Sequence, residues 1–172
     1  IQPPLPACLG NEGVGETSDG RKVIFPFQNL QNWRGFWRDQ LIVPTSDLVY
    51  LPDELDWVQG SMFTVNPLTA WALLHEFVSL KPGDWIIQNL ANSSVGYWVH
   101  VVATLLGVNV VHVVRTEAQK IRLEEMGFNE VHTQEALFSR QNEAHHKRKQ
   151  YRLALNGVGG KSGYELDRKS TR

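Results

Sequence analysis

The residues best suited to bind a phosphate follow a short apolar run at residues 85–90. That run predicts a buried strand, and Ala91-Asn92-Ser93-Ser94-Val95-Gly96 leads from it into a predicted helix. In dinucleotide-binding folds the backbone N–H groups of such a turn meet the cofactor pyrophosphate. The G-x-G-x-x-G pattern is reduced here to Gly96, with Ala91 and Ser93 at the other glycine positions. Because Asn and Ser are also preferred helix caps, spacing alone favours a cofactor turn and an ordinary capped helix equally.

A second candidate is Arg115, which directly follows the mostly apolar run at residues 108–114. It stands about twenty residues after the turn, where NAD-binding proteins typically carry an acidic residue that holds the ribose diol. A guanidinium at this place favours the 2′-phosphate of NADPH, to which it can donate charge-assisted hydrogen bonds. Thr116 could add a hydroxyl, and Glu117 begins the next predicted helix. The alternative is a surface arginine at a strand end, which the preceding turn makes less favoured.

These candidates need a scaffold, and the pattern after Asn66-Pro67 predicts an α/β fold. Pro67 suits a first helical position, and the next residues lack helix breakers. Helices are expected at residues 69–80, 95–106 and 117–126, and strands at 85–90, 108–114, 130–132 and 152–156. Short strands that alternate with helices predict a parallel sheet with crossover helices.

The residues before this alternation have a different character. Residues 10–52 are rich in Gly and Pro and contain short β-branched or aromatic runs, such as 21–27 and 39–43. This pattern is typical of short strands in a barrel-like β domain. We therefore expect a first domain at residues 1–60 and a nucleotide-binding domain at residues 61–166.

Composition excludes several classes of function. The chain has 172 residues and a net charge of -1, which gives no reason to expect nucleic acid or an anionic membrane as a partner. The basic run at residues 145–149 is interpreted as a solvated surface. The longest apolar runs of the chain fall short of the roughly 18 residues that a membrane span needs. The single cysteine, Cys8, excludes an intrachain disulfide and a four-cysteine zinc site.

The segment Gly10-Asn11-Glu12-Gly13-Val14-Gly15-Glu16 resembles the G-H-E-G-x-G motif of zinc alcohol dehydrogenases. Asn11 stands where that motif has the histidine at the metal site, and a carboxamide is a poor zinc ligand. The six histidines are scattered and no H-E-x-x-H occurs. We therefore expect no metal and a metal-free reaction.

Several blocks together give a closer resemblance, which spans Gly10 to about residue 166. The chain resembles the mitochondrial and bacterial trans-2-enoyl-CoA or acyl-carrier-protein reductases, the zinc-free branch of the medium-chain dehydrogenase/reductase superfamily. The blocks are Gly10-Asn11-Glu12-Gly13, Val65-Asn66-Pro67-Leu68-Thr69-Ala70, Lys81-Pro82-Gly83-Asp84, residues 88–96, Val113-Val114-Arg115 and residues 153–162.

This resemblance implies a partial GroES-like β-barrel segment followed by an incomplete Rossmann doubly wound parallel sheet. It implies NADPH as the cofactor, with contacts from Asn66, Asn92, Ser93, Ser94, Val95, Arg115, Thr116 and Glu117. The reaction would be reduction of the 2,3 double bond of a 2-enoyl thioester in fatty acid synthesis, carried by CoA or acyl carrier protein. The family's proton-assisting tyrosine should lie upstream of Ile1, so the catalytic residue of this chain is unknown.

The resemblance further implies a homodimeric parent enzyme in the bacterial cytoplasm, with the mitochondrial matrix as the alternative. A zinc-free quinone or alkenal reductase of the same superfamily is the rival enzyme. The other rival is a catalytically incomplete, cofactor-binding or inert fragment, and we expect these 172 residues alone to be inactive.

The chain also departs from the family pattern. Gly157 stands where the family usually has cysteine, and Trp37 of a G-x-W-like segment is interpreted as a barrel-core tryptophan. Residues 167–172 look like a non-native tail, so we expect the natural sequence to stop near residue 166 and to begin upstream of Ile1.

Overall fold

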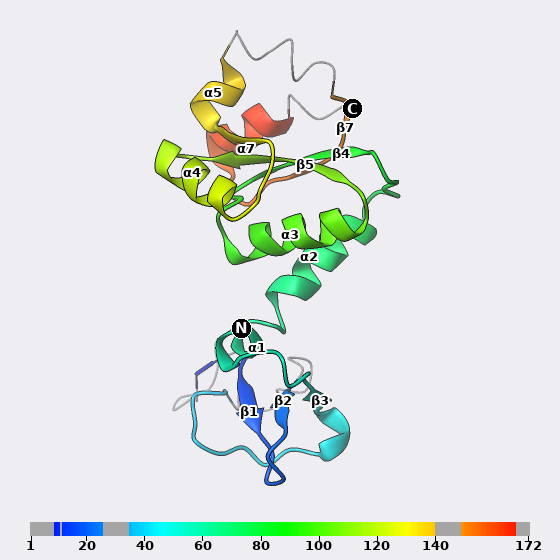
Figure 1. Cartoon of the computed structure of the whole chain (residues 1–172), viewed down its shortest axis with the longest axis vertical. Coiled ribbons are helices and arrows are strands. Elements are labelled where there is room, and N and C mark those ends of the chain that lie inside the picture. Colours follow the sequence, from blue (N-terminus) through cyan, green and yellow to red (C-terminus); the bar gives the residue numbers. More distant parts are fainter. Residues whose placement is uncertain (1–8, 11, 26–34, 140–148, 168–172) are drawn as a thin grey trace. The chain divides into compact units, whose positions relative to one another are not determined.

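The structure is a computed structural model that describes residues 9–10, 12–25, 35–139 and 149–167. Two compact units divide the chain, residues 1–68 and residues 69–172 (Figure 1). The boundary expected between residues 60 and 61 falls inside helix α1 (Trp57–Ser61). Cys8, Asn11, most of the basic run and residues 168–172 lie outside the described residues.

The first unit contains a small antiparallel sheet in the order β1-β2-β3. Its strands are β1 (Val14–Glu16), β2 (Lys22–Ile24) and β3 (Val49–Tyr50). A short 3-10 helix, η2 (Thr45–Asp47), precedes β3. Helix α1 begins after Asp56, whose side chain forms a capping box with Gln59. Buried Val23, Ile24, Phe25 and Leu51 form the apolar interior of this unit.

Two expectations for the first unit are wrong. Residues 39–43 form no strand: Ile42 is 94% exposed, and Pro44 lacks the N–H that a ladder would need. β3 pairs with β2 instead. Trp37 is no core residue, since it is 78% exposed, whereas its neighbour Phe36 packs against Phe25 with 5.9 Å between ring centroids.

The second unit is built on a four-stranded parallel sheet in the order β6-β5-β4-β7. Its strands are β4 (Trp85–Asn89), β5 (Asn109–Val114), β6 (Val131–Thr133) and β7 (Tyr151–Leu155). Its helices are α2 (Asn66–His75), whose first three residues belong to the first unit, α3 (Ser94–Leu105), α4 (Glu117–Glu125), α5 (Gln134–Phe138) and α7 (Gly160–Asp167). The predicted alternation of strand and helix is therefore confirmed.

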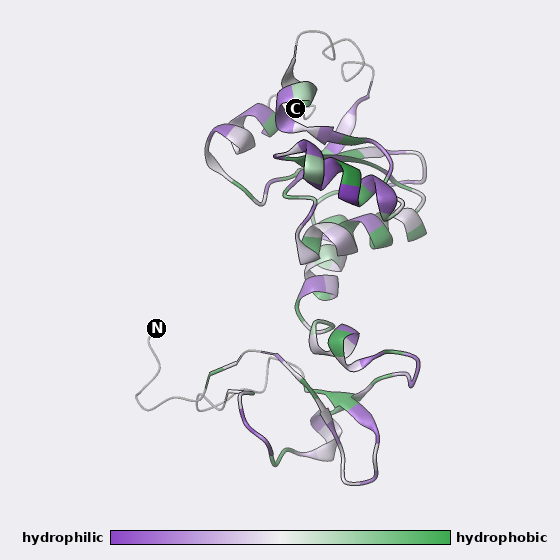
Figure 2. Ribbon diagram, turned by 60° about the vertical axis from the view of Figure 1, so that its left-hand side comes forward, coloured by the Kyte–Doolittle hydropathy of each residue, from purple (hydrophilic) through white to green (hydrophobic). Residues whose placement is uncertain are grey.

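Helices cover both faces of this sheet, as a doubly wound fold requires (Figure 1). Alternate residues of a strand point to opposite faces. Ile86 of β4 packs with residues of α2 and α3, while its neighbour Ile87 packs with Leu137 of α5 and Leu166 of α7. Figure 2 shows hydrophobic and hydrophilic residues side by side on the helices of this unit, and α3 buries Gly96, Val99, Val102 and Ala103, which lie on one face of the helix.

Three features of the second unit differ from expectation or were missed. Helix α2 ends at His75, earlier than the predicted residue 80. Helix α5 was not predicted because the polar region after residue 134 has no clear apolar period. Helix α7 was not predicted either, and it extends to Asp167, the first residue of the expected tail. No helix in the described ranges is long and apolar enough to cross a membrane.

Gly96 allows α3 to approach the end of β4 closely. A Cβ at residue 96 would lie 2.6 Å from the carbonyl oxygen of Ala91 and 2.8 Å from its Cα. Both atoms belong to backbone and cannot rotate away. The surviving glycine of the turn is therefore needed for close packing of helix on strand, the role of the third glycine in dinucleotide-binding turns.

We predict that Gly96→Ala destabilises the protein by about 1 to 3 kcal/mol, the usual cost of overpacking. Gly157→Ala is the matched control, because a Cβ there would meet only Leu90 side-chain atoms at 3.4 and 3.5 Å. Thermal unfolding followed by circular dichroism measures both. Equal melting temperatures for the two variants would show that the close approach at Gly96 is unimportant.

Candidate cofactor site

A pocket of about 300 Å³ lies at the carboxyl end of the parallel sheet. The strand order β6-β5-β4-β7 matches strands 3-2-1-4 of a dinucleotide-binding fold, with its change of direction between β4 and β7. Ligands of such folds bind at this point. The pocket is lined by Asn89, Leu90, Asn92, Val113, Val114, Arg115, Gln119, Gln134, Gly157, Val158 and Ser162.

The turn between β4 and α3 presents backbone amides at the start of the helix. Ser93 caps α3, and its Oγ accepts a hydrogen bond of 3.0 Å from the N–H of Gly96. The N–H groups of Ser94 and Val95 precede the first intrahelical bond, so the helix itself offers them no acceptor. Two outward amides and the positive end of the α3 dipole favour an anion here.

A series of hydrogen-bonded polar side chains, Gln88, His112 and His100, also holds the start of α3. Gln88 Nε2 donates to the carbonyl oxygen of Gly96 and to Nδ1 of His112, both at 2.9 Å. Since Nδ1 of His112 accepts, its ring proton lies on Nε2, which donates to Nδ1 of His100 at 3.2 Å. Phe128 stacks on His100, with ring centroids 3.9 Å apart. The turn before α3 is thus connected to the centre of the sheet.

His112 is only 1% exposed, and this burial lowers its pKa to about 3. The nearby rings of His100 and His132 lower the pKa of His112 further. Burial also lowers the pKa of His100. Both rings are therefore neutral at physiological pH, which the directed hydrogen bonds of the chain require.

Two asparagines join β4 to the loop after β7 at the floor of the pocket. Asn89 Nδ2 donates to Asn156 Oδ1 at 2.9 Å and to Ser162 Oγ at 3.2 Å. Asn89 Oδ1 accepts from the N–H of Gly157 at 2.7 Å, and Asn156 Oδ1 accepts from the N–H groups of Val158 and Gly159. Sequence reasoning missed these residues. The available signal was a polar residue at the carboxyl end of each of two buried strands.

Arg115 lies at the other side of the pocket, directly after β5. Its side chain is exposed, and it forms no ion pair within the part of the chain that the structure describes. The adjacent turn is fixed by a capping box in which Thr116 Oγ1 accepts from Gln119 N and Gln119 Oε1 accepts from Thr116 N. An unpaired guanidinium on a fixed backbone suits a phosphate.

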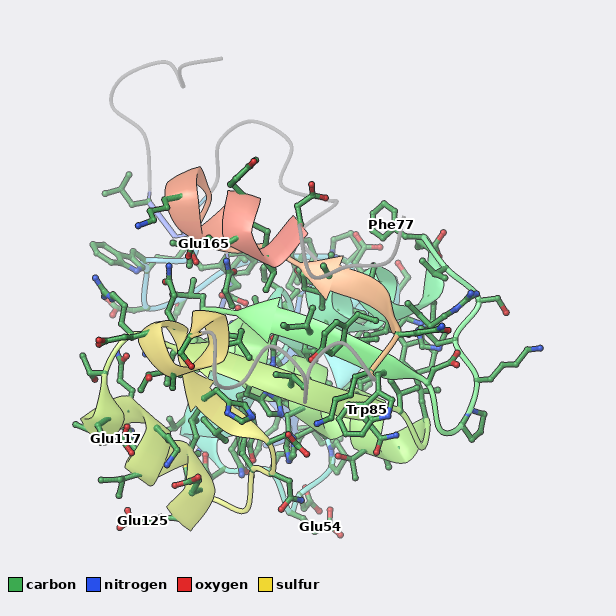
Figure 3. All side chains as sticks on the ribbon, turned by 90° about the horizontal axis from the view of Figure 1, so that it is seen from above. Glu54, Phe77, Trp85, Glu117, Glu125 and Glu165 are labelled. Carbon is green, nitrogen blue, oxygen red and sulfur yellow. The ribbon has the colours of Figure 1, made fainter. Side chains whose placement is uncertain are left out.

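Glu117 lies in the first turn of α4, at the far end of that helix from Glu125 (Figure 3). Lys120 donates to the carboxylates of Glu117 and Glu124 at 3.0 and 3.3 Å, and these bonds raise the pKa of Lys120. The charge of Glu117 is thereby offset beside the site.

The structure thus brings together some of the eight residues predicted to contact the cofactor. Asn92 and Arg115 line the pocket. Ser93, Ser94 and Val95 form the turn and first helical residues next to Asn92, and Thr116 and Glu117 follow Arg115. Asn66 belongs to the first unit, as the first residue of α2. The described residues contain no group of three or more His, Cys, Asp or Glu side chains arranged for a metal ion.

The chain is similar in sequence and structure to several known proteins. No protein-family model matches the chain. The curated mitochondrial enoyl-[acyl-carrier-protein] reductase of Caenorhabditis elegans is 36% identical over 182 residues, which cover 96% of this chain and 50% of that protein. The chain therefore spans about half the length of the curated relatives that it matches.

Solved structures show the same similarity. The complex of Etr1p with NADP and crotonyl-CoA superimposes with a TM-score of 0.81 at 32% identity, covering 96% of this chain and 53% of that one. The mitochondrial 2-enoyl thioester reductase Etr1p/Etr2p heterodimer of Candida tropicalis matches with a TM-score of 0.81 at 30% identity, with the same coverage. The predicted resemblance and fold class are confirmed.

We predict that acidification destabilises the protein through His112. Because the pKa of His112 is about 3 when folded and about 6.5 when unfolded, the unfolded state binds more protons in this range. The free energy of unfolding should therefore fall by about 2 kcal/mol between pH 6.5 and 4.5. This window lies mainly above the range in which carboxylates such as Glu130 titrate.

Denaturant unfolding across this pH range measures the slope. His112→Asn keeps an acceptor for Gln88 but does not titrate, so its slope should be flatter than that of the wild type. Val111→Ala, at a buried residue of the same strand that does not titrate, is the control: it should lower stability at every pH and keep the wild-type slope. A slope that is unchanged in His112→Asn would contradict the assignment.

Proposed function

We propose, since this chain belongs to the enoyl-acyl-carrier-protein reductase family within the medium-chain dehydrogenase/reductase superfamily, that it forms the NADPH-binding part of a 2-enoyl thioester reductase. The main support for this proposal is the position of Arg115 in the pocket. An arginine without an ion pair among the described residues lines the pocket at the point where a dinucleotide fold binds the adenosine ribose. Among the described residues, no acidic side chain lines that pocket.

The residues present fit this cofactor. The amides of Ser94 and Val95, with Asn92 beside them, would bind the pyrophosphate. The guanidinium of Arg115 would bind the 2′-phosphate. The hydroxyl of Thr116 already accepts the N–H of Gln119 but can still donate its own proton to a phosphate oxygen. The predicted contacts from Glu117 and Asn66 remain proposals.

The proposed reaction is hydride transfer from NADPH to the β-carbon of a 2-enoyl thioester, with protonation at the α-carbon. The bound cofactor supplies the hydride, and this chain binds and orients the cofactor. The rigid turn before α3 and the asparagine-linked loop after β7 hold the two sides of the pocket in place. Such preorganisation helps to keep reacting groups at a productive distance.

The named relatives support further proposals about the substrate, the oligomeric state and the cellular compartment of the protein. The Etr1p complex contains crotonyl-CoA, which supports a 2-enoyl thioester of CoA or acyl carrier protein as the substrate. The related heterodimer supports a dimeric enzyme, for which we propose a homodimer. The curated relatives are mitochondrial, which favours the mitochondrial matrix over the bacterial cytoplasm that the sequence alone led us to expect.

We predict that the protein containing this chain reduces crotonyl-CoA or longer 2-enoyl thioesters with NADPH and does not reduce simple quinones. Steady-state rates of NADPH oxidation with each class of acceptor test this. The saturated thioester should form in equal amount to the NADPH consumed. Activity on quinones without activity on enoyl thioesters would transfer the assignment to the quinone reductases.

We predict that Arg115→Ala lowers the affinity for NADPH and leaves the affinity for NADH nearly unchanged. One or two lost charge-assisted bonds, each worth about 1.5 to 3 kcal/mol, correspond to roughly ten-fold to on the order of ten-thousand-fold in affinity. Dissociation constants for both cofactors, measured by calorimetry, give the ratio.

Arg122→Ala is the matched control, because Arg122 is an exposed arginine in the last turn of α4 and does not belong to the residues that line the pocket. It should leave both affinities unchanged. An NADPH to NADH ratio that is the same in Arg115→Ala and the wild type would mean that Arg115 is an ordinary surface residue.

A further inference from the structure

Gln119 is a pocket residue whose side chain contacts the backbone of Arg115. It lies in the first turn of α4, is half-buried and lines the same pocket as Arg115. Its side chain turns back to the strand end, where Oε1 accepts hydrogen bonds from the N–H of Arg115 at 3.1 Å and of Thr116 at 3.3 Å.

These two bonds determine the orientation of the amide group. A backbone N–H can only donate, so the atom that receives both must be the side-chain oxygen. The Nε2 group, with two N–H donors, is then the free end of the side chain. It forms no hydrogen bond within the described residues.

The result is a pocket wall at the end of β5 whose free side-chain groups donate. Arg115 brings the five N–H donors of a guanidinium and no acceptor, and Gln119 has its single acceptor already occupied. A phosphate, which accepts hydrogen bonds, is complementary to such a wall. A ribose diol must donate as well, and for that purpose NAD-binding sites typically offer a carboxylate.

We propose that Gln119 is a specificity-determining residue for the 2′-phosphate of the cofactor, in addition to Arg115. Its Oε1 holds the backbone of Arg115 and Thr116 in place, and its Nε2 donates to the phosphate. This inference rests on the proposed function, because it assumes that the pocket binds NADPH.

Gln119→Glu separates the two roles of the side chain. One carboxylate oxygen can still accept from Arg115 N and Thr116 N, and Glu is an ordinary residue at this position of a capping box. The other oxygen replaces the donor with an acceptor of negative charge. The helix cap should therefore persist and the melting temperature should stay close to that of the wild type, while phosphate binding is opposed.

The test uses the whole chain and two small probes, adenosine 2′,5′-bisphosphate and adenosine 5′-monophosphate, which differ only in the 2′-phosphate. Calorimetry gives the dissociation constant of each. Gln119→Glu should lower the affinity for the bisphosphate by about ten-fold or more and change the affinity for the monophosphate little. Ile121→Glu adds the same charge on an exposed position of the same helix and should leave the ratio unchanged.

Gln119→Met provides a second variant if Gln119→Glu does not fold. It removes both the Nε2 donor and the Oε1 acceptor without adding charge, and should lower the preference for the bisphosphate by about three-fold to ten-fold. Equal weakening of both probes, or no weakening of either, would overturn the role of Gln119 as a specificity residue. If Arg115→Ala lowers the ratio while both Gln119 variants keep it, only this inference fails. A wild-type chain with no preference for the bisphosphate would overturn the proposed function as well.

Discussion

The first turn of α3 lies directly on the backbone of Ala91, and this close contact positions the rest of the site. It is possible because residue 96 has no side chain. Gln88 then donates to the carbonyl oxygen of Gly96 and connects that turn through His112 to His100. The amides of Ser94 and Val95 therefore point outward from a backbone that is held on two sides. A pyrophosphate needs this arrangement, because each amide adds to affinity only if it is already in place.

The opposite side of the pocket is fixed by different means. Asn89 and Asn156 join the ends of β4 and β7, where the strand order changes direction. Next to β5, the bonds from Arg115 and Thr116 to Gln119 hold the strand end against α4. Lys120 meanwhile draws the carboxylate of Glu117 into an ion pair. Polar side chains thus fix the loops around the pocket, while apolar packing holds the sheet and its helices.

The sequence predicted the strands of the second unit well because they carry apolar runs, and it predicted α3 and α4 because each begins after a residue suited to a helix cap. β4 and β5 were expected within a residue of where they lie, and Arg115 was placed at the strand end from spacing alone. Asn89, Asn156 and Gln119 were missed because their roles depend on partners distant in the chain or on the direction of one side chain. Residues 39–43 and Trp37 misled the prediction, since an apolar run or a tryptophan does not show whether a partner strand or a core lies beside it.

We propose that the turn before α3 and the end of β5 bind one NADPH between them. A titration of the isotope-labelled chain with NADP+, followed by the backbone amide resonances, tests this most directly. We expect the largest shifts at Ser94, Val95 and Arg115, and, with NAD+ at the same concentration, much smaller shifts at Arg115. Shifts of equal size with both nucleotides, or shifts confined to residues outside the pocket, would contradict it.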